Sequence, residues 1–303
     1  MARGNLLEVS HLTKSYKRKE VLKEVGFYIK PAEIVGFIGP NGAGKTTTMK
    51  CICNLVYPDK GSIIIDGYDI ARHRDKAIAS LAAIIESPGL FLELTGRENI
   101  KMIAELKGIN VSRVDEIVNF IGIGSNIDRK VAGYSMGMKQ RLGLGIAILG
   151  KPKLLILDEP TNGLDPSAVI VLRNTLKNLV ESEGISILFS SHQLGEVEKL
   201  ADRILFINDG VITEMPSQIY ANSRYFIRCE NGKNALSIIN NTCLNVSCNY
   251  ISNDTISVDV ISEQMFNEIL CSLINGHIAI YDISKETIDV ETIYKSIYGE
   301  RND

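Results

Sequence analysis

The chain has 303 residues, of which 45% are hydrophobic and 23% are charged, and its formal net charge is −3. This length allows one large domain with a small one, or two comparable domains. The slightly acidic balance offers no general attraction for nucleic acid, so we expect no nucleic-acid partner. No apolar run reaches the roughly 18 to 20 residues that a membrane-spanning helix needs, and the first residues lack the pattern of a signal peptide. We therefore expect a cytoplasmic protein that reaches a membrane only through a partner.

Strand patterns occur throughout the first 70 residues. We predict strands at 6–9 and 25–30, with an exposed hairpin at 16–20 between them. The run at 33–38 is almost wholly apolar and predicts a buried strand. Another short strand, bracketed by turn residues, is predicted at 61–67.

The segment directly after the buried strand is rich in glycine and ends in a lysine and two threonines. Its spacing is that of a P-loop, in which glycines let successive N–H groups point at phosphate oxygens, helped by the positive end of the following helix. We predict that Lys45 reaches the β- and γ-phosphates of a nucleoside triphosphate and that the Thr46 hydroxyl binds Mg²⁺. The predicted phosphate-binding residues are Gly39, Pro40, Asn41, Gly42, Ala43, Gly44, Lys45, Thr46 and Thr47.

The middle of the chain combines helix and strand patterns. From about 90 to 149 the pattern is helical, with Thr95 as a predicted N-cap. Two buried strands at 153–157 and 184–189 then flank a helix at 168–181. This order predicts a parallel βαβ unit that shares one sheet with the P-loop strand.

Two carboxylates follow the first of these buried strands. Asp158 comes after four apolar residues, and a carboxylate at a strand end beside a P-loop can hold Mg²⁺. Glu159 is predicted to be the general base for the attacking water, because a packed strand end can hold its carboxylate within hydrogen-bond reach. Taken alone, the two residues could simply terminate a strand, but the P-loop upstream favours the catalytic interpretation.

The six cysteines show no paired spacing of the kind that metal ligands have. Cys51 and Cys53 are two residues apart in the predicted P-loop helix, so they cannot share a face of it. We expect buried free thiols.

Four further motifs establish a family resemblance. Residues 134–141, Tyr-Ser-Met-Gly-Met-Lys-Gln-Arg, resemble the signature motif of ATP-binding cassette (ABC) proteins, and they precede the strand-end carboxylates by the short distance that this family shows. Residues 162–165 resemble its D-loop, and Ser-Ser-His at 190–192 resembles its switch-histidine segment. Tyr16 falls where the family places an aromatic ring on adenine. Over residues 6–215 the chain is similar to a cassette ATPase.

The resemblance implies both a fold and a mechanism. The implied fold is an α/β P-loop NTPase with a RecA-like core, an N-terminal antiparallel β subdomain and a helical signature subdomain at about 88–150. Two cassettes face each other head to tail, so that Ser135 and Gly137 of one copy contact the γ-phosphate on the other. His192 contacts the same phosphate and positions the water, as a second catalytic residue. Asp165 joins the nucleotide site through the D-loop.

Two departures from the family pattern narrow the subfamily. Where most cassettes carry a glutamine that contacts Mg²⁺ and the membrane subunit, this chain has Glu86, whose carboxylate can still be an oxygen ligand. The signature contains Ser-Met-Gly-Met in place of Ser-Gly-Gly-Gln. Both features are similar to ATPase subunits that export lantibiotics and bacitracin-like peptides for self-protection. A solvated loop carboxylate is the alternative for Glu86, and a surface residue of the hairpin is the alternative for Tyr16.

The resemblance also implies ligands, partners and a location. We expect ATP and Mg²⁺, separate membrane permease subunits, a second copy of the chain, and a peripheral position on the inner face of the cell membrane. An antimicrobial peptide is the leading cargo; sodium, a lipid or a small drug are the alternatives. A soluble cassette ATPase acting on DNA or ribosomes is a further alternative, although the chain has one cassette and no heptad run. Leu90 and Phe91 are expected to receive a helix of the membrane subunit, and a plain turn at 87–91 is the alternative.

The pattern changes near residues 215–217, and we predict a cassette domain at 1–219 and an accessory domain at 220–303. The second domain has a β-α-β-β-α-β order, which is typical of a small α+β ferredoxin-like module. We expect it to hold two cassettes together, and a regulatory binding site is the alternative. Its predicted elements are strands at 225–229, 244–251, 255–260 and 278–283 and helices at 235–240, 263–274 and 290–298.

Overall fold

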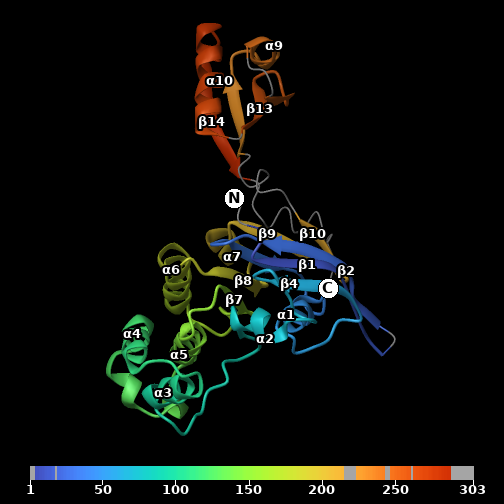
Figure 1. Ribbon diagram of the computed structural model, residues 1–303. Coiled ribbons are helices and arrows are strands. Elements are labelled where there is room, and N and C mark those ends of the chain that lie inside the picture. Colours follow the sequence, from blue (N-terminus) through green and yellow to red (C-terminus); the bar gives the residue numbers. More distant parts are fainter. Residues whose placement is uncertain (1–3, 18, 215–222, 243–245, 261, 288–303) are drawn as a thin grey trace. The chain divides into compact units, whose positions relative to one another are not determined.

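Figure 1 shows the computed structural model of the chain, which describes residues 4–17, 19–214, 223–242, 246–260 and 262–287. The chain divides into two units, residues 1–214 and residues 215–303, and each has its own hydrophobic core. The helix predicted at 290–298 lies outside the described residues. Within the described ranges, no helix has the length and apolarity needed to cross a membrane.

A six-stranded sheet lies at the centre of the first unit. Its neighbouring strands are parallel, except for the antiparallel pair at one edge. Three central strands are buried along their whole length, which explains their nearly continuous apolar sequences. In spatial order the strands are β10 (Val211–Glu214), β9 (Arg203–Asn208), β3 (Ile34–Ile38), β8 (Ser186–Ser191), β7 (Leu154–Leu157) and β6 (Leu81–Ile84).

The predicted βαβ unit is confirmed, because α6 (Pro166–Glu183) joins the parallel neighbours β7 and β8. Asp165 caps the start of this helix, and Pro166 occupies its first turn, where a missing N–H costs nothing. Gly184 ends the helix in a left-handed conformation at φ 67°. The short helix α7 (Leu194–Leu200) then leads from β8 to β9.

A second, antiparallel sheet is formed by strands within residues 7–29 and 60–69, on either side of β3 and the P-loop in the sequence. Its strands, in spatial order, are β2 (Lys19–Ile29), β1 (Leu7–Tyr16), β4 (Lys60–Ile65) and β5 (Tyr68–Asp69). The hairpin closes where Tyr16 pairs with Lys19. Both strands are longer than predicted, because the pairing register shifts between Val9 and Leu12 and again further on, which interrupts the alternation of apolar residues.

One core connects the two sheets of the first unit through the P-loop helix α1 (Lys45–Ile52). Met49 and Ile52 of this helix are fully buried, in the same cluster as Leu7 of β1 and Phe37 of β3. Burial of this kind holds the start of α1 rigidly against the end of β3.

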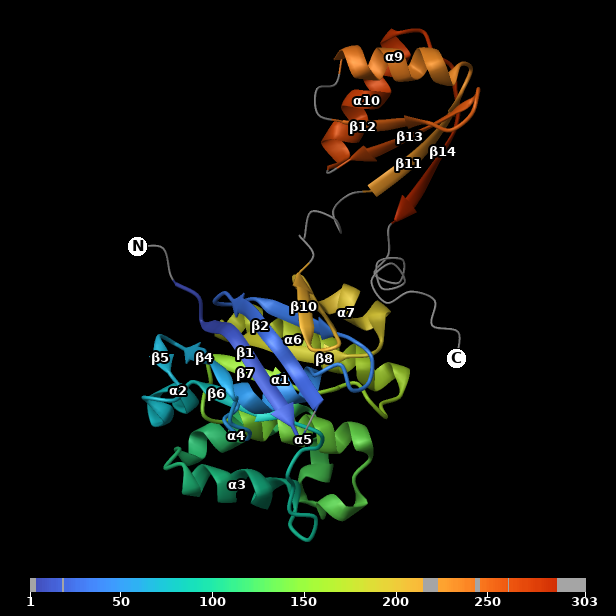
Figure 2. The same cartoon turned by 90° about the vertical axis from the view of Figure 1, so that its right-hand side faces the viewer.

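Helices form the part of the first unit between β6 and β7 (green in Figures 1 and 2), as predicted for 90–149. The principal helices are α3 (Gly96–Leu106), α4 (Val111–Ile121) and α5 (Met136–Ile148). Thr95 is the N-cap of α3, and it forms a reciprocal capping box with Glu98. A shorter helix, α2 (Arg74–Ala79), precedes β6.

In its described residues, the second unit is a four-stranded antiparallel sheet with two helices, and Figure 2 labels these elements. The predicted β-α-β-β-α-β order is confirmed, and the spatial order β12–β13–β11–β14 is that of a ferredoxin-like fold. Both helices bury apolar residues in one cluster with β11 and β13. The elements are β11 (Ser223–Cys229), α9 (Gly232–Thr242), β12 (Ser247–Tyr250), β13 (Thr255–Val260), α10 (Glu263–Asn275) and β14 (Ile280–Thr287).

Candidate active site

The P-loop connects β3 to α1 and depends on its glycines. Gly44, the N-cap of α1, has φ 118°, and Gly42 has φ 81°. A side chain at Gly44 would also bring its Cβ to 2.7 Å from Leu22 Cδ2, and one at Gly39 would collide with the carbonyl oxygen of Ile207. At position 44 the backbone has a positive φ and there is no room for a Cβ, and only glycine satisfies both conditions. The loop can therefore curl with its backbone N–H groups toward a phosphate.

Lys45 lies inside this loop and is only 6% exposed. Its ammonium donates to the carbonyl oxygens of Gly39 at 2.6 Å and Pro40 at 3.4 Å, and it lies 3.7 Å from Glu159 Oε1. A buried charge needs such partners. The group is therefore held at the mouth of a loop whose shape and charge suit a phosphate anion.

Thr46 and Asp158 are brought together, as expected from the parallel sheet. Thr46 Oγ1 donates to Asp158 Oδ2 at 2.8 Å, and Ser190 Oγ donates to Asp158 Oδ1 at 2.7 Å. Asp158 is 7% exposed, so both of its oxygens are fixed in direction. A hydroxyl beside a carboxylate is a hard-oxygen donor set of the kind that Mg²⁺ prefers, so these residues fit that ion.

The Glu159 carboxylate lies between Lys45 and His192. His192 Nδ1 lies 2.7 Å from Glu159 Oε2, and the backbone N–H of His192 donates to the same oxygen at 3.3 Å. The backbone N–H of Glu159 donates to Ser190 Oγ at 2.8 Å. Glu159 has φ 48°, a left-handed conformation that a residue with a side chain rarely adopts. The two residues predicted to be catalytic are thus in direct contact.

Glu86 is paired with a residue of α1 other than Thr46. Its Oε1 accepts from Lys50 Nζ on α1 at 2.7 Å. The Lys50 ammonium holds the pKa of the Glu86 carboxyl below its usual range, and Glu86 in turn raises the pKa of Lys50. Glu86 also has a left-handed backbone, with φ 66°. Its predicted role as a Mg²⁺ ligand therefore stays a prediction.

Tyr16, Ser135, Gly137 and Asp165 lie outside this hydrogen-bonded cluster. Tyr16 ends β1 with a ring that is 45% exposed. Ser135 is the N-cap of α5 and accepts from Met138 N at 3.3 Å, whereas Asp165 caps α6 and accepts from Ala168 N at 3.0 Å. The Ser167 hydroxyl and the Ala168 N–H, which both donate to Asp165, hold the pKa of its carboxyl below its usual range.

Close packing joins the signature to the D-loop within one chain. A Cβ at Gly137 would lie 3.3 Å from Ala168 Cβ and 3.9 Å from Leu164 Cδ2. Met136, which is 55% exposed, lies against Gly163. The start of α5 therefore rests on the start of α6.

Sequence reasoning gave Ser190 no role of its own, although it binds both Asp158 and Glu159. Its position could have indicated this role, because Ser190 is a polar residue at the end of a buried strand, and the neighbouring strand leads into the two carboxylates. Lys50 was also missed, because only the folded chain places it beside Glu86.

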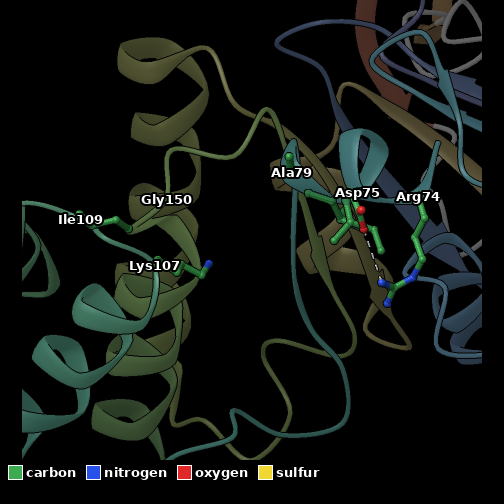
Figure 3. Close-up of a pocket in the computed structure, with 8 residues that line it drawn as sticks. Arg74, Asp75, Ala79, Lys107, Ile109 and Gly150 are labelled. Carbon is green, nitrogen blue, oxygen red and sulfur yellow. Dashed lines mark ion pairs between the residues drawn. The ribbon is translucent and has the colours of Figure 1, made fainter.

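A hollow of about 520 Å³ near α2, shown in Figure 3, does not belong to this site. Arg74 and Asp75 on its wall are exposed, and their nearest charged atoms are 3.9 Å apart. None of its lining residues belongs to the P-loop, the strand-end carboxylates or the signature. Among the described residues, no cluster of three or more metal-binding side chains occurs either.

The fold and the joined site residues define a P-loop nucleoside triphosphatase. The family described as ABC transporter matches residues 22–162. The lantibiotic transport ATP-binding protein SrtF of Streptococcus pyogenes is 43% identical over 207 residues, which cover 68% of this chain and 89% of SrtF. The bacitracin transport ATP-binding protein BcrA of Bacillus licheniformis is 37% identical over 212 residues, which cover 70% of this chain and 69% of BcrA.

A solved structure described as the ATP-binding subunit of an ABC transporter is 33% identical, with a TM-score of 0.63. The match covers 69% of this chain and 90% of that one. The chain belongs to the ABC transporter family, as an ATP-binding and ATP-hydrolysing subunit.

Proposed function

We propose that this chain powers the export of an antimicrobial peptide, of the lantibiotic or bacitracin type, through separate membrane subunits. The ATPase activity is supported by one connected cluster of side chains. In this cluster Thr46 binds Asp158, and Glu159 lies between Lys45 and His192. The cargo part is supported by the names of SrtF and BcrA, which are lantibiotic and bacitracin transport proteins.

The chemistry follows from the protein groups in this cluster. Lys45 and the loop N–H groups bind the phosphates of ATP, and Thr46 and Asp158 would hold Mg²⁺. When bound, Mg²⁺ neutralises phosphate charge and so lowers the barrier to attack. Glu159 accepts the proton of the attacking water, and His192 keeps the Glu159 carboxylate in one orientation through the 2.7 Å contact.

A second copy completes the site in this proposal. Ser135 and Gly137 lie at the start of α5, where free N–H groups and the helix dipole favour an anion. Within the described chain, the Ser135 hydroxyl binds only the first turn of its own helix. Both residues are thus available to the γ-phosphate of a second cassette in a head-to-tail homodimer.

The membrane subunit would dock near the loop at 91–95. Of the pair expected to receive it, Phe91 is 52% exposed, whereas Leu90 is only half-buried; the next residue, Leu92, is 48% exposed. The loop is rigid, because the buried Asn99 side chain accepts from Phe91 N and donates to the carbonyl oxygens of Phe91 and Thr95. An exposed apolar pair on a loop held by hydrogen bonds suits a partner helix, and it supports a position of the chain at the inner face of the membrane. A Phe91→Asp variant that keeps full export activity would contradict this docking site.

The test of the proposed function is the sensitivity of cells to a panel of peptide antibiotics that includes lantibiotics and bacitracin. The cells carry this gene with its neighbouring membrane-subunit genes, and Glu159→Gln serves as the inactive control. We expect protection against one peptide that disappears in the control. Equal sensitivity of the two strains to each peptide would contradict the peptide cargo and favour sodium, a lipid or a small drug.

A further inference from the structure

The ion pair between Lys50 and Glu86 connects the P-loop helix to the loop that follows β6. Lys50 Nζ lies 2.7 Å from Glu86 Oε1, with side chains that are 31% and 68% exposed. Lys50 comes four residues after Thr46, so both lie on the same face of α1. One helix face therefore binds two carboxylates: Thr46 binds Asp158, and Lys50 binds Glu86.

The strand order explains why the two carboxylates are neighbours. β6 and β7 are parallel and adjacent, with Ile84 opposite Leu157. Asp158 follows β7 directly, and Glu86 follows β6 by two residues, so both lie at the same edge of the sheet. A triphosphate bound at the P-loop would add further negative charge there. Uncompensated carboxylates at this edge would repel it, and with low-dielectric walls this repulsion is not fully screened.

We infer that Lys50 is a positioning residue that neutralises Glu86 and so permits a carboxylate beside the nucleotide. Lys50 also lies within the electrostatic influence of Asp158 and Tyr16, which raise the pKa of its ammonium in addition to Glu86. This inference rests on the assignment of the nucleotide site and is independent of the cargo.

The exposure of the pair decides what its removal should change. Exposed ion pairs contribute little to folding, because solvent screens them and ordering two long side chains costs entropy. Loss of Lys50 should therefore leave the fold intact and change the local charge that ATP meets. If the ion pair only stabilised the fold, removing the Glu86 carboxylate in addition to Lys50 would not restore ATP binding.

The test is a double-mutant cycle on the full-length chain with Lys50→Met and Glu86→Gln. ATP affinity is measured in EDTA and in Mg²⁺, and kcat and KM are measured separately. We expect Lys50→Met to weaken ATP binding about five- to tenfold in the wild-type chain, most strongly in EDTA, and less than about twofold in the Glu86→Gln chain. Lys153→Met is the matched control, because Lys153 forms an ion pair of the same 2.7 Å length with Asp66 outside the site. It should bind ATP as the wild type does.

Two outcomes would overturn the inference. One is ATP binding by Lys50→Met that equals the wild type, and the other is an equally large loss in the Glu86→Gln chain. Failure of the nucleotide-site assignment would look different, because Lys45→Ala would then still bind ATP. Recovery of ATP binding in the double variant, together with loss of ATP binding in Lys45→Ala, would support both the role of Lys50 and the assignment of the nucleotide site.

Discussion

Glu159 combines an unfavourable backbone with a favourable set of contacts. Its left-handed φ of 48° costs about 1 kcal/mol or more, and the surrounding hydrogen bonds must offset this. Ser190 fixes its backbone, His192 fixes one carboxylate oxygen, and Lys45 lies near the other. Strain that is maintained by contacts with three residues is typical of a functional residue rather than of a strand end.

The first prediction concerns the Glu159→Gln variant. It keeps the shape of the side chain but cannot accept a proton, so we expect ATP binding to persist while hydrolysis falls about 10²- to 10⁴-fold. Equilibrium ATP binding and steady-state phosphate release measure the two effects. Glu198→Gln, on the exposed side of α7, should hydrolyse ATP normally. Normal hydrolysis by Glu159→Gln would show that another group is the base.

The second prediction concerns the thiols of the P-loop helix. Burial raises the pKa of Cys51 to about 11 and that of Cys53 to about 12. Thiolate is the reactive form, so native Cys51 should alkylate far more slowly than the exposed Cys271 at pH 8. Its rate should keep rising about tenfold per pH unit above pH 9, where an unperturbed thiol levels off. Mass spectrometry of iodoacetamide-treated native protein tests this, and equal early labelling of Cys51 and Cys271 would contradict it.

At the scale of elements, the P-loop and its helix could be predicted because their constraints are local. Glycine spacing, the apolar β3 run and the threonines that open α1 all lie within 20 residues. The convergence of Asp158 with Thr46 also followed from the sequence, since parallel strands end at one edge of a sheet. By contrast, β9 was missed because its four-residue apolar run suits helix and strand equally, and β10 because it has only two apolar residues. The Lys50–Glu86 pair depends on which loop packs on α1, and no local pattern specifies that.

The third prediction compares alanine substitutions at two glycines with left-handed backbones, of which only Gly44 has atoms close to the added Cβ. Gly44→Ala adds a Cβ 2.7 Å from Leu22 Cδ2 to a left-handed conformation, so we expect a loss of about 2–4 kcal/mol in the free energy of unfolding, with ATP binding lost. Gly184→Ala meets open space and should lose only about 1 kcal/mol while binding ATP normally. Chemical denaturation and nucleotide titration measure both. Equal losses in the two variants would contradict the packing argument.

At the scale of the molecule, the two units are built on separate cores. The core of the first joins two sheets through α1, whereas the core of the second joins two helices to its own antiparallel sheet. The residues of the nucleotide site described above all belong to the first unit. We therefore propose that residues 220–303 act on assembly rather than on hydrolysis itself.

The fourth prediction follows from this division. A chain ending at residue 219 should fold, because it keeps the complete core of the first unit, and it should bind ATP with unchanged affinity. If the second unit holds two cassettes together, the ATP-dependent dimer of the truncated chain should dissociate at least about tenfold more readily. Light scattering of both lengths in the Glu159→Gln form measures this. Equal dimerisation would contradict the assembly role and favour a regulatory one.

The half-exposed ring of Tyr16 at the end of β1 has a practical consequence, because the chain contains 11 tyrosines and no tryptophan. A Tyr16→Trp substitution would introduce the only indole of the protein at the position expected to stack on adenine. Its fluorescence could be excited selectively, and stacking would change both its intensity and its wavelength. Arrival and release of the nucleotide could then be followed in real time without an attached dye.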